Sequence, residues 1–90
     1  MSKFTIKLFS SKTCPHCLVT KNIINSQVLP KYDIELIILD IHQNLDEAKE
    51  YGFSGSSAPF TVLLKGVDPI YTTGMIRLQE FIKILDQYND

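Results

Sequence analysis

The stretch that decides the fold is residues 4–17, which reads Phe-Thr-Ile-Lys-Leu-Phe-Ser-Ser-Lys-Thr-Cys-Pro-His-Cys. Apolar and polar side chains alternate from Phe4 to Leu8, and this period of two predicts a β-strand with one apolar face. Residues 10–13 form a polar loop, and Pro15 suits the first position of a helix, where its missing N–H would lack a partner anyway. The stretch therefore predicts a strand and a helix that meet at two cysteines.

The rest of the chain continues the alternation of strands and helices. We expect a helix that ends before Pro30, a strand at 34–40, a helix from Asn44 to about Tyr51, strands at 60–64 and 70–73, and a last helix after Gly74. A right-handed crossover makes the first two strands parallel, and the closing hairpin adds antiparallel strands. The order β-α-β-α-β-β-α therefore predicts an α/β fold with a mixed four-stranded sheet flanked by helices on both faces.

Three local patterns refine this arrangement. Residues 37–39, Ile-Ile-Leu, leave no polar face, which predicts a buried strand at the centre of the sheet. Asn44, followed three residues later by Glu47, predicts a helix N-cap. Four apolar residues of the last helix form a stripe that should lie on the sheet: Leu78, Phe81, Ile82 and Leu85.

Composition and charge exclude several classes of protein. The 90 residues fit one domain, 1–90, and are 44% hydrophobic and 21% charged, as in ordinary globular proteins. A formal net charge of −1 offers no basic surface for nucleic acid or for an anionic membrane. The longest aliphatic run, residues 36–39, is far shorter than the roughly 20 residues that span a bilayer. Because the N-terminal stretch lacks the apolar core of a signal peptide, we expect a cytoplasmic protein.

The two cysteines, Cys14 and Cys17, are poorly placed for a structural disulfide. A loop this small contributes roughly 2 kcal/mol, against roughly 3 kcal/mol for a 15-residue loop. A reducing cytosol would not keep such a bridge for stability, so the spacing indicates either a dithiol that cycles or half of a metal site.

A C-x-x-C pair at the start of a helix suits thiol–disulfide exchange. The positive end of the helix dipole favours an anion at Cys14, so we expect the pKa of this thiol to lie below the free value of roughly 8.5 and Cys14 to be the nucleophile. Cys17, one turn into the helix, is more shielded and suits a resolving thiol. His16 should stabilise the Cys14 thiolate further, which makes the pair a better oxidant.

Other interpretations of the pair remain open. Zinc usually takes four ligands, and beyond the two cysteines only His16 and His42 are typical partners; His16 lies between the cysteines and is poorly placed to close the same shell. His42 follows the second strand and is more simply a surface residue. An inert surface pair of cysteines is the remaining alternative.

The chain resembles the thioredoxin/glutaredoxin family of oxidoreductases, and within it a small glutaredoxin-sized thioredoxin with a Cys-Pro-His-Cys active site. The resemblance rests on residues 14–17, the Tyr-Gly-Phe turn at 51–53, Ala58-Pro59 and Gly74. It implies that Pro59 is cis and faces the dithiol, and that Ala58, Pro59 and Gly74 bind substrate. In this family the backbone before the proline pairs with substrate peptide as an added strand. Pro15 belongs to the same active-site motif.

Departures from the family patterns limit what the resemblance implies. Thioredoxins carry a buried Asp six residues before the first cysteine, and this position is Leu8 here, so the proton acceptor for Cys17 is not evident. Glutaredoxins have a Lys three residues before that cysteine, where this chain has Ser11, with Lys12 one residue out of register. A single Gly74 replaces their Gly-Gly pair, and Arg77 lies three residues after it. Glutathione binding is therefore not implied, although Lys12 or Arg77 could meet a carboxylate.

The resulting expectation is a disulfide oxidoreductase that exchanges electrons with disulfide-containing proteins or small disulfides. No bound cofactor or metal is required, and the reducing equivalents come from a reductase or from a small thiol such as glutathione. We expect a monomer that takes part in electron transport and cell redox homeostasis. A glutathione-dependent glutaredoxin and a redox-inert interaction module with this fold are the alternatives. We expect the 54–57 loop, Ser-Gly-Ser-Ser, to lie beside the dithiol, where it either shapes partner choice or serves as a connector.

Overall fold

The computed structural model describes residues 3–55 and 58–88, so Ser56 and Ser57 of the 54–57 loop lie outside the described residues. The elements in chain order are β1 (Phe4–Ser10), α1 (Pro15–Ile23), the π-helical segment η1 (Ile24–Val28), β2 (Ile34–Asp40), α2 (Leu45–Glu50), β3 (Phe60–Lys65), β4 (Asp68–Thr73) and α3 (Leu78–Tyr88). This is the predicted order of elements. β4 begins two residues earlier than predicted, and the last helix begins at Leu78 rather than directly after Gly74.

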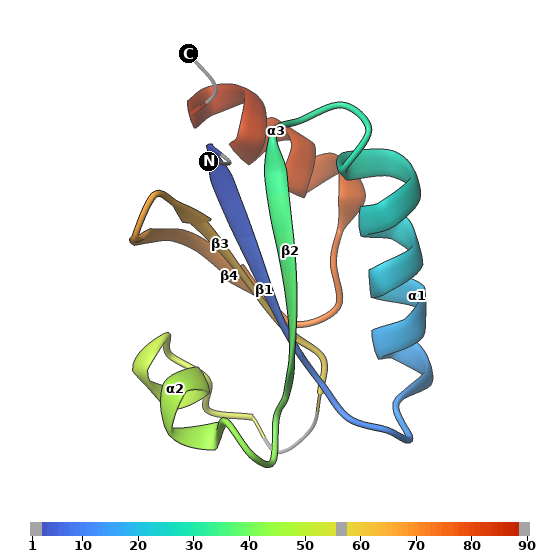
Figure 1. The fold of residues 1–90 in the computed structure, drawn as a ribbon, viewed down its shortest axis with the longest axis vertical. Helices are drawn as coiled ribbons and strands as arrows, with labels where there is room; N and C mark the ends of the chain where they lie inside the picture. The colour runs from blue at the N-terminus through green and yellow to red at the C-terminus, as the bar shows by residue number, and fades with distance from the viewer. Residues whose placement is uncertain (1–2, 56–57, 89–90) are drawn as a thin grey trace.

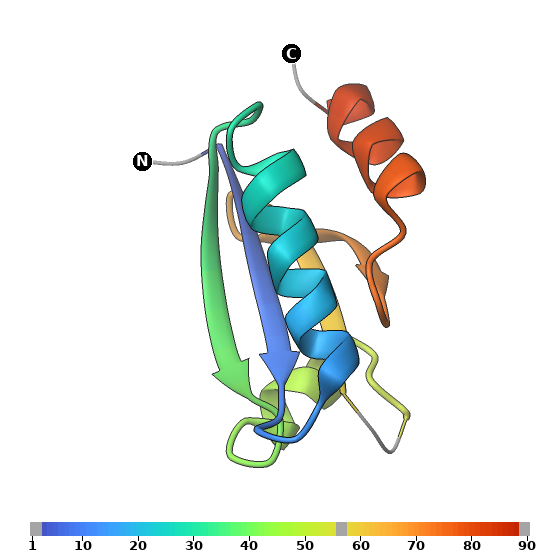
Figure 2. The same ribbon diagram turned by 90° about the vertical axis from the view of Figure 1, so that its right-hand side faces the viewer.

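The four strands form one mixed sheet in the order β2-β1-β3-β4. β1 pairs parallel with β2 and antiparallel with β3, and β3 pairs antiparallel with β4. Figures 1 and 2 show α1 and α3 on one face of the sheet and α2 on the other. The predicted fold class, a mixed four-stranded sheet with helices on both faces, is confirmed.

Each face of the sheet has its own apolar cluster, because successive residues of a strand point to opposite faces. On the α1 face, Phe4 and Ile6 pack with Ile24, Phe81 and Leu85. On the α2 face, the buried cluster is formed by Phe9, Ile41, Ala48, Phe60, Val62 and Leu64. The two central strands, β1 and β3, therefore carry the core.

The prediction that residues 34–40 form the central strand is wrong. β2 lies at an edge of the sheet, and none of its residues falls in the buried class; Ile38 is 44% exposed. An apolar run shows that both faces of a strand contact apolar neighbours, but it does not show which neighbours flank the strand. The apolar side chains of β2 pack partly against each of the two clusters and leave Ile38 in contact with solvent.

Two helix predictions are corrected in detail. Asn44 is the N-cap residue of α2, but its side chain makes no capping hydrogen bond. Its Nδ2 instead donates to the Asp40 backbone carbonyl at 2.9 Å. In the last helix, Phe81 and Leu85 are buried as predicted, while Ile82 is only half-buried.

Candidate active site

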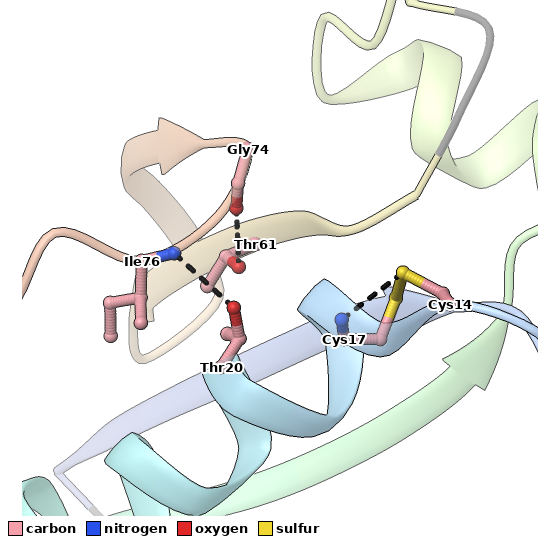
Figure 3. The surroundings of a disulfide bond; sticks show 6 residues. All are labelled: Cys14, Cys17, Thr20, Thr61, Gly74 and Ile76. Carbon is pink, nitrogen blue, oxygen red and sulfur yellow. Dashed lines mark hydrogen bonds between the residues drawn. A yellow bond between two sulfur atoms is a disulfide. The ribbon is translucent and has the colours of Figure 1, made fainter.

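Cys14 and Cys17 form a disulfide at the start of α1 (Figure 3), with 5.2 Å between their Cα atoms. Cys14 is the N-cap residue in an extended conformation, and Pro15 is the first residue of the helix. The strand–loop–helix sequence predicted from residues 4–17 therefore places both sulfur atoms at one helix terminus.

The two cysteines differ in exposure and in electrostatic surroundings. Cys17 is 5% exposed, whereas Cys14 is half-buried. The Cys17 backbone N–H donates to Cys14 Sγ with an N···S distance of 3.1 Å. A backbone donor at the positive end of a helix favours a negative charge on the sulfur that it contacts. This arrangement suits the prediction that Cys14, the less buried cysteine, is the nucleophile in the reduced protein.

His16 lies on the exposed surface of α1, directly after Pro15. Within the described part of the chain, no hydrogen bond joins its ring to either sulfur. Its tuning role therefore stays a prediction.

The loop before β3 and the loop after β4 lie together. The Ala58–Pro59 peptide bond is cis, as the resemblance implies. Gly74 lies beside it, because a Cβ added to Gly74 would be 3.7 Å from the Pro59 carbonyl oxygen. Thr61 Oγ1 donates to the Gly74 carbonyl at 3.0 Å. The structure thus brings together Ala58, Pro59 and Gly74, the three residues predicted to bind substrate.

A second hydrogen bond joins the loop after β4 to the helix that carries the dithiol. The Ile76 backbone N–H donates to Thr20 Oγ1 at 3.4 Å, one turn beyond Cys17 (Figure 3). Thr20 and Thr61 are the buried polar residues among positions 3–55 and 58–88. Leu8, at the position of the thioredoxin Asp, is 1% exposed. The described residues therefore place no buried carboxylate beside Cys17.

Two hollows meet at Cys14. The hollow on the α1 side, here the α1 hollow, has a volume of about 470 Å³ and is lined in part by Leu8, Lys12, Cys14, Cys17, Leu18, Lys21 and Ile38. The hollow on the α2 side, here the α2 hollow, has a volume of about 490 Å³ and is lined in part by Cys14, His42, Leu45, Lys49, Phe53 and Ala58.

Sequence reasoning missed the position of His42. This residue is exposed, as expected of a surface residue, but it also lines the α2 hollow with Cys14. Its backbone N–H donates to Asp40 Oδ1 at 2.8 Å, which fixes the turn after β2. The signal was available, because the carboxyl ends of parallel strands meet at one edge of a sheet, and residues that follow β1 and β2 belong to the same site.

The candidate ligands for a carboxylate are separated by the fold. Lys12 lines the α1 hollow beside the dithiol, whereas Arg77 lines a separate shallow hollow at the start of α3. Across residues 3–55 and 58–88, no group of three or more His, Cys, Asp or Glu side chains is arranged to hold a metal ion. No helix in this part of the chain is long and apolar enough to cross a membrane.

Comparison of the backbone with solved structures decides the fold. A mutant thioredoxin from Halobacterium salinarum superimposes with a TM-score of 0.80 over 99% of this chain and 77% of its own, at 17% identity. A thioredoxin from Nicotiana alata gives a TM-score of 0.77 over 100% of this chain and 76% of its own, at 20% identity. This protein has the thioredoxin fold.

The sequence comparison also finds a thioredoxin. The chain is 36% identical to a thioredoxin from Methanocaldococcus jannaschii over 53 residues, which are 58% of this chain and 62% of that protein. No family model matches the chain. The resemblance to thioredoxins drawn from the cysteine motif and its surroundings is therefore confirmed by a thioredoxin homologue and by the thioredoxin fold.

Proposed function

We propose that this protein is a thiol–disulfide oxidoreductase whose reaction centre is the Cys14–Cys17 pair. The observation that carries the proposal is the asymmetry of the pair at the start of α1. Cys14 is accessible and accepts a hydrogen bond from a backbone N–H, whereas Cys17 is 5% exposed. The thioredoxin homologue and the thioredoxin fold support the same activity.

The reduced protein would act in two exchange steps. The Cys14 thiolate attacks one sulfur of a substrate disulfide, the substrate S–S bond breaks, and one half leaves and takes up a proton. Cys17 then loses its proton and attacks Cys14 Sγ, which re-forms the Cys14–Cys17 bond and releases the other half as a thiol. The substrate gains two electrons and two protons, and the protein loses them.

Substrate binding belongs to the loops beside the dithiol. The Ala58 backbone would pair with an extended segment of the substrate by β-augmentation, next to Pro59 and Gly74. His16 would stabilise the Cys14 thiolate, and Pro15 would fix the first turn that holds the pair. These roles follow from the resemblance together with the positions described above.

The wider setting of the reaction is part of the same proposal. The chain would act as a single domain, residues 1–90, and as a monomer in the cytoplasm, with roles in electron transport and cell redox homeostasis. Disulfide-containing proteins or small disulfides would be its substrates. Electrons would come from a reductase or a small thiol such as glutathione, and the exchange itself uses no bound cofactor.

Insulin reduction tests the proposal. The wild-type protein should accelerate precipitation of reduced insulin in the presence of dithiothreitol, and Cys14→Ser should abolish the acceleration. Supplying electrons by thioredoxin reductase or by glutathione with its reductase then separates a thioredoxin from a glutaredoxin. A Cys14→Ser variant that keeps full partner binding, beside a wild type without reductase activity, would identify a redox-inert interaction module instead.

A further inference from the structure

The α1 hollow combines three kinds of surface in one place. Cys14 and Cys17 both line it, and so do three residues with aliphatic side chains, Leu8, Leu18 and Ile38. Leu8 and Ile38 are paired neighbours in β1 and β2. Leu18 is 60% exposed and Ile38 is 44% exposed, so an apolar surface beside the disulfide is open to a ligand.

The charge of the α1 hollow is positive. Lys12 and Lys21 both line it, and no acidic side chain does so among the described residues. Neither lysine has an ion-pair partner within residues 3–55 and 58–88. Asp40, the last residue of β2, does not line the hollow, and its Oδ1 accepts hydrogen bonds from the backbone N–H groups of His42 and Gln43. The α1 hollow therefore carries two positive charges and no neutralising acid among the described residues.

The position of the α1 hollow separates it from the proposed peptide site. Among the described lining residues, none comes from the Ala58–Pro59 segment or from Gly74. Its volume of about 470 Å³ lies within the roughly 300–1,000 Å³ range of small-molecule pockets. The hollow thus has the size for a small compound. Its lining is complementary to a ligand with an aliphatic chain, an anionic group and a sulfur group that can react with the Cys14–Cys17 pair.

We propose that the α1 hollow binds small dithiols and disulfides that carry an aliphatic chain ending in a carboxylate, and that these compounds exchange electrons there with Cys14–Cys17. The aliphatic chain lies against Leu18 and Ile38, and the carboxylate lies at Lys12 and Lys21. This inference rests on the proposed exchange activity and names a substrate class for it.

The exchange balances without another reactant. A thiolate of the bound dithiol attacks Cys14 Sγ, the Cys14–Cys17 bond breaks, and Cys17 leaves and takes up a proton. The second thiol of the compound then attacks its own sulfur in the mixed disulfide, closes a cyclic disulfide and releases Cys14. Two electrons and two protons pass from the dithiol to the protein, and the reverse sequence reduces the cyclic disulfide.

Dihydrolipoate and dihydrolipoamide are matched probes, because they differ only in the charge at the end of the aliphatic chain. The quantity to measure is the rate constant with which each probe reduces the Cys14–Cys17 disulfide. Acid quenching, alkylation and mass spectrometry can follow it, since the chain has no Trp whose fluorescence would report the reaction. The ratio of the acid rate to the amide rate should exceed one at low salt and fall as salt is added.

Charge-removing variants test the two lysines. Lys12→Gln and Lys21→Gln should each lower the acid-to-amide ratio by roughly two- to fivefold, the size expected for exposed ion pairs, and the double variant should bring it to about one. Lys31→Gln is the matched control, an exposed lysine beyond η1 that lines neither hollow. A ratio of one in the wild type, or a ratio that persists in the double variant, overturns the proposal.

A binding measurement separates this site from the exchange activity. Octanoate has the chain and the carboxylate but no sulfur, and octanamide is its neutral control. Octanoate should shift the backbone NMR signals of Leu18, Lys21 and Ile38 more than octanamide does, and the Lys12→Gln, Lys21→Gln double variant should lose the difference. If octanoate binds but the protein does not reduce insulin, the ligand site stands and the proposed function is wrong. If the protein reduces insulin but octanoate does not bind, the proposed function stands and the ligand site is wrong. Self-association that protects Leu18 and Ile38 assigns the hollow to a second copy and rejects the ligand.

Discussion

The two faces of the sheet differ in the polar groups that they bury. Lys7 and Leu8 are neighbours in β1 and therefore point to opposite faces. On the α2 face, Lys7 Nζ donates to Glu47 Oε2 at 2.9 Å and to the Tyr51 hydroxyl at 3.0 Å. On the α1 face, the buried polar residues of the described chain are the hydroxyl-bearing Thr20 and Thr61. The sheet thus keeps a charged network on one side and a neutral interior beside the dithiol on the other.

This difference shows where the thiolate stabilisation must come from. Beside Cys17 there is no buried charge among the described residues, so the groups placed to stabilise a thiolate are the backbone N–H at Cys14 Sγ, the end of α1 and the exposed lysines of the α1 hollow. The proton that leaves Cys17 must then go to water or to a substrate group rather than to a buried carboxylate.

Leu8→Asp should produce the largest effect, because it places a carboxylate in the neutral interior. We expect a loss of about 3–5 kcal/mol in the free energy of unfolding at pH 7. Burial raises the pKa of such a carboxyl, so the loss should shrink as the pH falls and the group becomes protonated. Urea unfolding followed by circular dichroism measures it.

Leu8→Asn is the matched control, with the same shape and no charge. Its loss should be smaller at pH 7 and nearly independent of pH. Equal losses for the Asp and Asn variants at pH 7 would show that the α1 face tolerates charge and would remove the contrast between the faces.

Lys7→Met tests the charged network on the α2 face. The variant removes both hydrogen bonds of the ammonium group and should cost about 1–2 kcal/mol. Glu47→Gln should cost less, because Tyr51 still accepts a hydrogen bond from Lys7. A double-mutant cycle on Lys7 and Glu47 measures the coupling free energy between them. A coupling of zero would show that their ion pair does not contribute to stability.

The same network predicts how stability changes at alkaline pH. Hydrogen bonds to Tyr51 and Glu47 raise the pKa of Lys7 above 10.5. Burial, followed by a hydrogen bond with Glu80, raises the pKa of Tyr71 above 10.0. Both groups bind their protons more tightly in the folded state, so their stabilisation is present below these values and is lost as the pH rises past them. Urea unfolding from pH 9 to 11 should show a decline that is shallower in Lys7→Met; a flat wild-type profile contradicts this assignment.

The smallest effect is expected from His16, which lies in water at the first turn of α1. His16→Gln removes the imidazole beside Cys14 and should make the disulfide harder to reduce, by roughly two- to fivefold in the equilibrium constant, the size of an electrostatic effect at an exposed helix end. Equilibration in glutathione buffers at pH 6 measures it. An unchanged constant would make His16 a bystander and leave the backbone N–H as the local source of thiolate stabilisation.

The sequence predicts those parts of the molecule that depend on local chemistry. The helix start at Pro15 and the shared position of the two cysteines follow from spacing and backbone preference alone. The edge position of β2 does not, because the apolar run around Ile38 reports contacts on both faces and says nothing of strand order. The place of His42 beside Cys14 likewise depends on which strand ends meet. The cis bond before Pro59 came from the family resemblance rather than from composition.

The central claim is that Cys14 is the attacking sulfur and Cys17 the resolving one. The most direct measurement is the trapping of a mixed disulfide with a disulfide-bonded peptide, followed by mass spectrometry of the modified cysteine. The proposed mechanism predicts that reduced Cys17→Ser accumulates a stable adduct at Cys14, and that reduced Cys14→Ser reacts at least about tenfold more slowly because Cys17 is 5% exposed. Faster trapping at Cys17, or no adduct in Cys17→Ser, would contradict it.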